Sequence, residues 1–272
     1  MKITLRACQL MLAFFWVSVA GLAQTPDKLF EPIVGQEGKD VVWVPTPDVT
    51  VEKMLDVARL TPKDFVMDLG SGDGRNIIAA AKRGVRGIGV EYNPDMVEHS
   101  RRLAAREGVE EFAQFVEGDM FAADLSRATV LALFLLPDNL NKLVPQFLDL
   151  KPGTRIVLNH FGIDGWEADE TATAEGDCGS WCTVLLLIVP AKVEGKWQLP
   201  QGELVLEQKF QKLNGKLKSG GAEQAVEGRM LGERITFTAG GVTYEGRVNG
   251  ERITGVTKGR VAGSWTAVRK RS

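Results

Sequence analysis

Residues 65–81, FVMDLGSGDGRNIIAAA, combine a buried strand, a glycine-rich turn and a helix in one short stretch. The apolar run from Phe65 to Leu69 has the length of a strand. Gly70, Gly72 and Gly74 allow positive φ angles and the close approach of a ligand, and the Ile-Ile-Ala-Ala-Ala segment that follows is a good helix former. A strand, a glycine turn and a helix in this order form the ligand-binding corner of an open α/β sheet.

The glycine spacing and two acidic residues indicate the kind of ligand. A dinucleotide fingerprint has the spacing G-x-G-x-x-G, whereas this turn has G-x-G-x-G, and Arg75 stands where the third glycine would be. A bound pyrophosphate is therefore the weaker interpretation. Asp68 ends the first strand and Glu91 closes the next, so that one carboxylate can face an ammonium group and the other the hydroxyls of a ribose. S-adenosylmethionine carries both groups.

Each of three successive predicted strands has an acidic residue at its end: Asp68, Glu91 and, after a third strand, Asp119 in Gly118-Asp119. This ordered set resembles the class I S-adenosylmethionine-dependent methyltransferases, which implies a Rossmann-like α/β sheet and S-adenosylmethionine as the cofactor. The alternative is a doubly wound domain that binds another ligand. The residues predicted to bind the cofactor are Asp68, Gly70, Ser71, Gly72, Asp73, Gly74, Glu91, Tyr92, Asn93, Asp119 and Met120.

A narrower resemblance covers residues 43 to about 165. Its motifs are Val44-Pro45-Thr46-Pro47, Asp68-Leu69-Gly70-Ser71-Gly72-Asp73-Gly74-Arg75, Gly89-Val90-Glu91-Tyr92-Asn93-Pro94 and Leu133-Phe134-Leu135-Leu136-Pro137. They are similar to those of the lysine methyltransferases that modify the c-subunit of ATP synthase, and of their bacterial relatives. This resemblance implies a protein lysine as methyl acceptor and places Asp119 at the adenine. It also implies that the acceptor is bordered by the Leu136-Pro137 turn and by Val44, Pro45, Thr46 and Pro47.

The sequence departs from that family in two features. The C-terminal hairpin region has no counterpart in the animal members, and a secreted protein would not meet a cytosolic or mitochondrial target. In addition, no Asn-Pro-Pro-Tyr motif, the mark of many amino-group methyltransferases, follows the predicted fourth strand. Two rival classes therefore stay open beside protein-lysine methylation. They are a methyltransferase that acts on a small molecule, and an exported, non-catalytic module that kept the fold for binding.

The end of the fourth strand, Thr129 to Leu135, is where we expect the acceptor to enter. The sulfonium methyl group is already activated, so the site mainly aligns the nucleophile and excludes water. An amine acceptor must be neutral, and Asp138, Asn139 or His160 could take or orient its proton. Asp138 and Asn139 are also good helix N-caps, which is the alternative role. Pro137, Asp138 and Asn139 are the predicted catalytic residues.

Alternating strands and helices predict a parallel sheet with right-handed crossovers. After the arm at residues 24–40, helices are expected near Thr50 to Ala58, over Pro94 to Glu107 and over Leu140 to Leu150. Further strands are expected at Phe112 to Val116 and Thr154 to Asn159. This methyltransferase domain is predicted to span residues 41–190.

The hydrophobic period changes to two in the domain predicted at residues 191–272. Seven alternating stretches are separated by Asn214-Gly215, Gly220-Gly221, Gly240-Gly241 and Asn249-Gly250, which are typical hairpin turns. They predict an antiparallel β meander or small barrel. This hairpin region differs from the methyltransferase domain in hydrophobic period and in net charge, so we expect that domain to bind cofactor without it. The hairpin region itself either binds a ligand of its own or only stabilises the protein.

The first 23 residues resemble a secretory signal peptide. A basic start, an apolar run from Ala7 to Ala20 and Gly21-Leu22-Ala23 predict cleavage before Gln24 and export to the periplasm. The apolar run is short for a membrane span, and an uncleaved membrane anchor is the alternative. Cys178 and Cys182 could then form a small disulfide loop or stay as two free thiols.

Charge is divided unevenly along the chain. Residues 24–190 hold 16 basic and 27 acidic side chains, a net charge of −11, whereas residues 191–272 hold 15 basic and 8 acidic ones, a net charge of +7. The acidic part favours a basic methyl acceptor over an acidic one. We expect a protein or small-molecule acceptor, no nucleic-acid partner and no metal, since His99 and His160 lack ligand spacing to the cysteines. Proximity to a membrane is a further hypothesis, and the oligomeric state stays open.

Overall fold

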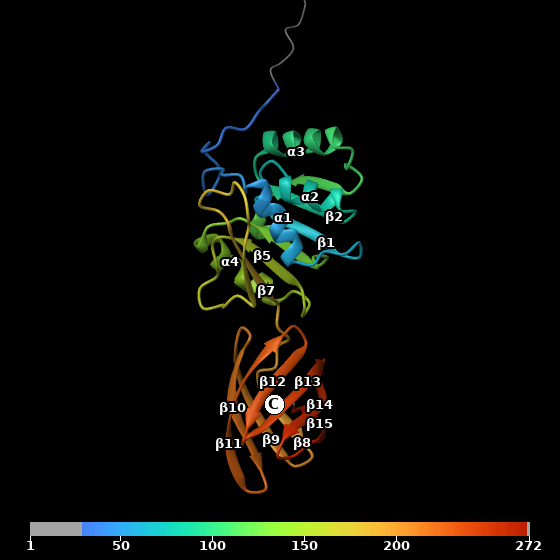
Figure 1. Cartoon of the computed structure of the whole chain (residues 1–272), viewed down its shortest axis with the longest axis vertical. Helices are drawn as coiled ribbons and strands as arrows, with labels where there is room; N and C mark the ends of the chain where they lie inside the picture. The colour runs from blue at the N-terminus through green and yellow to red at the C-terminus, as the bar shows by residue number, and fades with distance from the viewer. Residues whose placement is uncertain (1–28, 271–272) are drawn as a thin grey trace, which may run out of the picture.

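The computed structural model describes residues 29–270, which form a mixed sheet and a β-barrel joined end to end (Figure 1). The predicted signal peptide lies outside the described residues. The sheet has the order β3-β2-β1-β4-β5-β7-β6. Its strands are β1 (Phe65–Leu69), β2 (Arg86–Glu91), β3 (Ala113–Glu117), β4 (Val130–Leu133), β5 (Arg155–Asn159), β6 (Glu170–Thr173) and β7 (Thr183–Ile188).

The first five strands are parallel, as the alternation of strands and helices predicts. The order reverses between β1 and β4, so their carboxyl ends open onto the crevice where ligands bind in such sheets. All four residues of β4 are buried, because helices and loops cover both faces of the sheet. The Rossmann-like fold expected from residues 65–81 is therefore confirmed.

Helices cover the two faces unequally. One face carries α1 (Asp48–Val57), α2 (Arg75–Lys82) and α3 (Pro94–Arg106), whose apolar side chains form a core with Val66 and Val157 of the sheet. The other face carries α4 (Pro137–Leu148), packed on Leu131 and Leu133 of β4. A short 3₁₀ helix, η1 (Met120–Ala122), follows β3.

Two helix starts differ from the prediction. Helix α1 begins at Asp48 after Pro47, so Thr50 lies inside the helix and its hydroxyl donates to the carbonyl of Trp181 at 3.0 Å instead of capping. Helix α4 begins at Pro137 and has no side-chain cap. Asp138 and Asn139 therefore lie in its first turn and are not N-caps.

The antiparallel pair β6 and β7 was not predicted. Strand β7 pairs antiparallel with β5, and β6 lies at the edge of the sheet. The run Thr183–Ile188 is apolar and could be read as a buried strand. Strand β6 is short and polar, so its sequence shows no alternation that would predict a hairpin with β7. This edge brings the loop between β6 and β7 to the carboxyl end of β5.

The hairpin region closes into a barrel, the second of the two predicted forms. Its order is β10-β11-β12-β13-β14-β15-β8-β9, and β15 closes on β8 through the pairs Val268–Gln198 and Arg269–Trp197. Trp197, Phe237 and Ile253 lie in its filled interior. The strands are β8 (Gly195–Leu199), β9 (Gly202–Lys209), β10 (Lys212–Ser219), β11 (Ala222–Leu231), β12 (Arg234–Ala239), β13 (Val242–Asn249), β14 (Arg252–Gly259) and β15 (Gly263–Arg269). Within the barrel, β8 was not predicted, and the prediction of a hairpin turn at Asn214-Gly215 is wrong, because both residues pair with β9 inside β10.

The barrel contacts the sheet through apolar and charged residues. The ring of Phe210, in the β9–β10 turn, stacks on Trp166 with centroids 4.9 Å apart. Arg229 of β11 pairs with Asp169 at 2.7 Å, and the Asp169 side chain is only 4% exposed. A buried carboxylate needs such a partner, so these residues fix how the barrel sits on the sheet.

A fragment that ends at Pro190 is expected to bind cofactor as tightly as the whole chain, because every residue that lines the cavity described below precedes Cys182. It should be less stable by about 1–3 kcal/mol, because Trp166 loses its contact with Phe210. Calorimetric titration and thermal unfolding measure the two effects, and Phe210→Ala in the whole chain isolates the second. A soluble fragment that does not bind cofactor would refute the separation of the two parts.

Candidate active site

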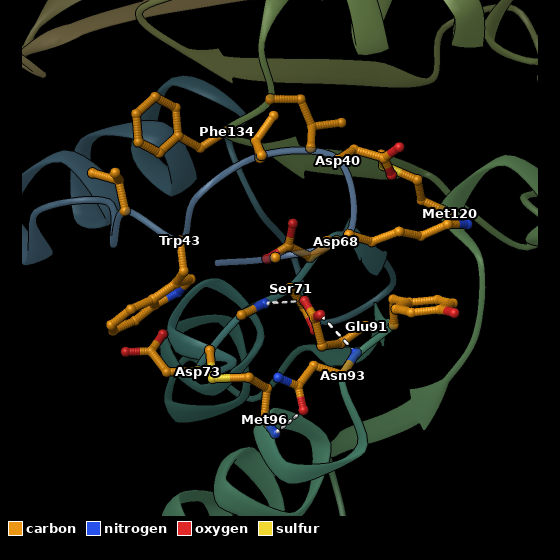
Figure 2. A pocket seen from close by; sticks show the side chains of 18 of the residues that line it. Asp40, Trp43, Asp68, Ser71, Asp73, Glu91, Asn93, Met96, Met120 and Phe134 are labelled. Atoms are coloured by element: carbon orange, nitrogen blue, oxygen red, sulfur yellow. Dashed lines mark hydrogen bonds between the residues drawn. The ribbon is translucent and has the colours of Figure 1, made fainter. Parts of the chain in front are cut away.

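A cavity of about 370 Å³ lies at the carboxyl ends of β1, β2 and β4 (Figure 2). Its floor is the glycine turn after β1, and the segment Gln36 to Thr46 of the N-terminal arm covers it. The volume is in the range of small-molecule sites. The cavity therefore occupies the place where an open α/β sheet binds its ligand.

Two positions of the glycine turn, Gly72 and Gly74, have positive φ angles and leave no room for a Cβ atom. Gly74 adopts φ +80° as the N-cap of α2, and a Cβ there would lie 2.5 Å from the Phe115 ring. Gly72 adopts φ +55°, and its amide donates to Oε2 of Glu91 at 2.9 Å. Asn93 donates its amide to the other carboxylate oxygen at 3.0 Å. Glu91 is thus held by two backbone donors and keeps acceptor capacity toward the cavity.

Asp68 is a buried carboxylate in the centre of the site. It is 3% exposed and accepts a hydrogen bond from Nδ2 of Asn76 at 3.0 Å. Burial raises the pKa of Asp68 well above its usual value, the Asn76 hydrogen bond opposes this, and the charges of Glu91 and Asp73 add to it. A cationic ligand would favour the charged form of Asp68.

The affinity for S-adenosylmethionine is expected to rise with pH until Asp68 is fully ionised. A ligand cation binds the carboxylate better than the carboxylic acid, and the raised pKa moves this rise to higher pH than an exposed aspartate would give. Calorimetric titrations between about pH 5 and pH 8 measure it. Asp68→Asn, which cannot ionise, should remove the dependence. If the affinity of Asp68→Asn changes with pH as much as that of wild type, a group other than Asp68 causes the pH dependence.

Asp119 and Lys39 form the far end of the cavity. Nζ of Lys39 lies 2.9 Å from Oδ2 of Asp119 and 4.6 Å from the centre of the Tyr92 ring. The hydrogen bond from Lys39 lowers the pKa of Asp119. Asp119 also accepts the amide of Phe121 at 2.9 Å, which fixes the carboxylate at the start of η1. Lys39 is a site residue that sequence reasoning missed, because the arm has no periodicity.

Arg75, which replaces the third glycine of a dinucleotide fingerprint, ties the arm to the glycine turn. Its guanidinium lies 2.6 Å from Oδ2 of Asp73 and donates to the carbonyl of Thr46 at 2.6 Å. Trp43, just before this point, covers Gly72. Arg75 therefore positions the predicted acceptor segment Val44 to Thr46 over the site.

Three aromatic side chains border the other end of the cavity. We call Phe134, Phe161 and Trp181 the aromatic wall. Figure 2 shows Phe134 and Met120 on opposite sides of the cavity, with Asp68 between them. His160 packs behind the wall at 4.8 Å from Phe161 and 5.0 Å from Trp181, measured between ring centres. The sequence interpretation missed the aromatic wall, because its members come from three separate loops.

Most of the predicted site residues line the cavity, and a few do not. Pro137 is half-buried, Asp138 is exposed, and Asn139 is buried at the first turn of α4, so these three lie beside the cavity and not on its surface. Gly74 and Pro47 lie at helix starts outside it. The predicted residues that do line the cavity are Asp68, Gly70, Ser71, Gly72, Asp73, Glu91, Tyr92, Asn93, Asp119, Met120, Val44, Pro45 and Thr46.

Residues 29–270 contain neither a cluster of metal ligands nor a membrane-spanning helix. In this part of the chain no three His, Cys, Asp or Glu side chains lie close enough together to hold a metal ion. No helix of the same residues is long and apolar enough to cross a membrane.

The arrangement fits S-adenosylmethionine. Glu91 presents a fixed carboxylate where a ribose can bind, Asp68 offers a second one deeper in the site, and Asp119 stands at the end near Met120. A Rossmann-like sheet with these strand ends defines a class I S-adenosylmethionine-dependent methyltransferase.

Known proteins agree with this class. Residues 68–170 match the ANTKMT methyltransferase domain. A protein-lysine N-methyltransferase of Saccharolobus islandicus is 41% identical over half of this chain and 86% of its own. The human lysine N-methyltransferase of the ATP synthase c-subunit is 32% identical over 51% of this chain. The crystal structure of an RNA methyltransferase from Salinibacter ruber, in complex with S-adenosyl-L-homocysteine, is 42% identical over 55% of this chain and 96% of its own, with a TM-score of 0.51.

The chain belongs to the class I methyltransferase family that includes the ATP synthase c-subunit and adenine nucleotide translocase lysine methyltransferases. The family predicted from the motifs is thus confirmed. The match spans 59% of the human c-subunit enzyme and 56% of the Xenopus laevis one.

Proposed function

We propose that the protein transfers a methyl group from S-adenosylmethionine to the side-chain amine of a lysine in another protein. One observation carries this proposal. A chain that is 41% identical over 139 residues to a protein-lysine N-methyltransferase has a cavity lined by the carboxylates of Asp68 and Glu91 and by an aromatic wall. Such a cavity can hold the cofactor and leave its methyl group facing the acceptor.

The chemistry needs alignment more than acid or base strength. When bound, S-adenosylmethionine supplies an activated methyl group on a positively charged sulfur. Asp68 and Glu91 bind and orient the cation, and the arm that Arg75 holds over the site excludes water. The acceptor nitrogen must lose one proton before it attacks. Pro137, Asp138 and Asn139 stay predictions for the acceptor entrance, and His160 stays a candidate for the proton.

An RNA acceptor is a second candidate, because the Salinibacter ruber RNA methyltransferase is 42% identical over nearly its whole length. Charge argues against it. Residues 24–190 carry a net charge of −11, whereas binding to nucleic acid depends on basic groups that neutralise phosphates. The same charge favours a lysine-bearing protein.

A labelling experiment separates the acceptor classes. The purified protein is incubated with methyl-labelled cofactor and with membrane, periplasmic and cytosolic extracts, and label is counted in protein, RNA and small molecules. Label in protein, absent with Asp68→Ala, supports the proposal. Label confined to RNA or to small molecules contradicts it. The absence of all label together with tight cofactor binding would indicate a fold kept for binding.

We further propose that the protein works in an oxidising compartment outside the cytosol. The signal-like residues 1–23 support this, as does the disulfide between Cys178 and Cys182. The mature chain should begin at Gln24 in the periplasmic fraction. Mass spectrometry that finds residues 1–23 still attached would favour the membrane anchor.

A further inference from the structure

The aromatic wall is built as a surface of the cavity. Phe134 follows β4, Phe161 follows β5 and Trp181 precedes β7. The ring centres of Phe134 and Trp181 lie 5.2 Å apart, and those of Phe161 and Trp181 lie 5.9 Å apart. Phe134 and Trp181 belong to neither apolar core of the sheet, and all three rings are partly exposed. Their packing therefore serves the cavity more than the core.

The disulfide loop holds the third member of this wall in place. Cys178 and Cys182 are bonded, with Cα atoms 5.1 Å apart, and Trp181 lies inside the loop that they close. The Trp181 amide donates to the carbonyl of Cys178 at 2.8 Å. Its carbonyl accepts from the hydroxyl of Thr50, which is fully buried in α1. One covalent bond and two hydrogen bonds thus hold the backbone of Trp181, from which the indole ring extends into the aromatic wall.

We propose that the aromatic wall is the subsite that receives the lysine side chain, and that the Cys178–Cys182 disulfide keeps Trp181 in the position this requires. The inference rests on the proposed function. Aromatic faces suit this acceptor because they pack against its four-carbon stem and attract its cationic head. They offer no strong hydrogen-bond acceptor that would hold the amine in an unreactive orientation.

The position of the wall relative to the cofactor groups supports this assignment. In Figure 2, Met120, the residue after Asp119, lies on one side of the cavity, Phe134 lies on the opposite side, and Asp68 lies between them. The rings of Phe161 and Trp181 pack against Phe134, with centres 6.1 Å and 5.2 Å from its own. In-line displacement requires the acceptor nitrogen to approach from the side of the methyl group opposite the sulfur. A ligand that spans Asp119 to Asp68 leaves the end bordered by the aromatic wall for that approach.

The test compares three variants with wild type. Trp181→Ala removes the ring, Trp181→Phe keeps an aromatic face, and the double variant Cys178→Ser and Cys182→Ser opens the loop. Each protein is incubated with methyl-labelled cofactor and extract protein, with and without reductant, and methyllysine is quantified after hydrolysis. Calorimetric titration with S-adenosylhomocysteine measures cofactor affinity, and thermal unfolding checks the fold.

Trp181→Ala should lower the rate of methyllysine formation at low extract concentration by about 5-fold to 30-fold. This is the loss of one cation–π contact of about 1–2 kcal/mol, converted at about 1.4 kcal/mol per factor of ten. Trp181→Phe should recover most of it. Reductant should lower the wild-type rate toward that of the double serine variant and leave that variant unchanged. The affinity for S-adenosylhomocysteine should be the same in all four proteins.

Two outcomes would overturn the inference, and they are distinguishable. If wild type forms methyllysine while Trp181→Ala and reduction leave the rate unchanged, the wall is not the acceptor subsite and the proposed function stands. If wild type binds S-adenosylhomocysteine but forms no methyllysine, the proposed function fails and the inference fails with it.

Discussion

Asp68→Ala and Glu91→Ala are each expected to weaken S-adenosylmethionine binding by about 1–3 kcal/mol, the cost of leaving a polar or charged partner unpaired. At about 1.4 kcal/mol per factor of ten, this is about a 5-fold to 150-fold rise in the dissociation constant. Loss of Glu91 removes a ribose partner and also frees the amides of Gly72 and Asn93. Loss of Asp68 removes the buried carboxylate of the cavity, which we expect to face the cationic end of the cofactor.

Asp95→Ala is the matched control for these two variants. Asp95 is an exposed acid in the first turn of α3, close in sequence to Glu91, and it does not line the cavity. Calorimetric titration should give it the wild-type affinity. If Asp68→Ala and Glu91→Ala also bind like wild type, the cofactor site lies elsewhere.

Gly72→Ala is expected to weaken cofactor binding by about tenfold or more, equivalent to about 1.4 kcal/mol. An added Cβ would lie 2.5 Å from Nε1 of Trp43, so the Trp43 side chain, which lines the cavity, must shift. The amide of Gly72, which positions Glu91, would shift with it. The positive φ of Gly72 adds a backbone strain of about 1–2 kcal/mol, which should appear as lower thermal stability.

Gly84→Ala separates strain from steric contact. Gly84 has φ +75°, but nothing lies within 4 Å of its added Cβ. This variant should lose similar stability and keep cofactor affinity. In a Trp43→Ala background, Gly72→Ala should also cost less affinity than in wild type, because the group it strikes is absent. Equal loss of affinity in the Gly72 and Gly84 variants would show that strain alone explains the effect.

The sequence predicts the sheet well because its signals are local. The five parallel strands are short apolar runs, and turn residues separate them from their helices. Asp68 and Glu91 lie at the carboxyl ends of β1 and β2, and Asp119 follows β3, so all three must meet at one edge of the sheet. Regular alternation and glycine turns predict the antiparallel strands of the hairpin region but leave open whether they form a meander or a closed barrel, and the structure shows the barrel. Strand β6 has neither signal, and it was missed.

The acceptor end of the site is not readable from the sequence in the same way. Phe134, Phe161 and Trp181 are far apart in the chain, and the unpredicted strand pair β6 and β7 is what brings Trp181 to the other two. The sequence interpretation instead assigned the acceptor to Pro137 and its neighbours. These residues form the first turn of α4, after β4, and they lie beside the cavity without lining it.

A crystal structure of the protein with S-adenosylhomocysteine tests the central claim most directly. We expect the ribose hydroxyls at Glu91, the adenine at Asp119 and Met120, and the sulfur facing the aromatic wall of Phe134, Phe161 and Trp181. An adenine bound between the rings of that wall, or a ligand outside the crevice between β1 and β4, would contradict the assignment of both the cofactor site and the acceptor end.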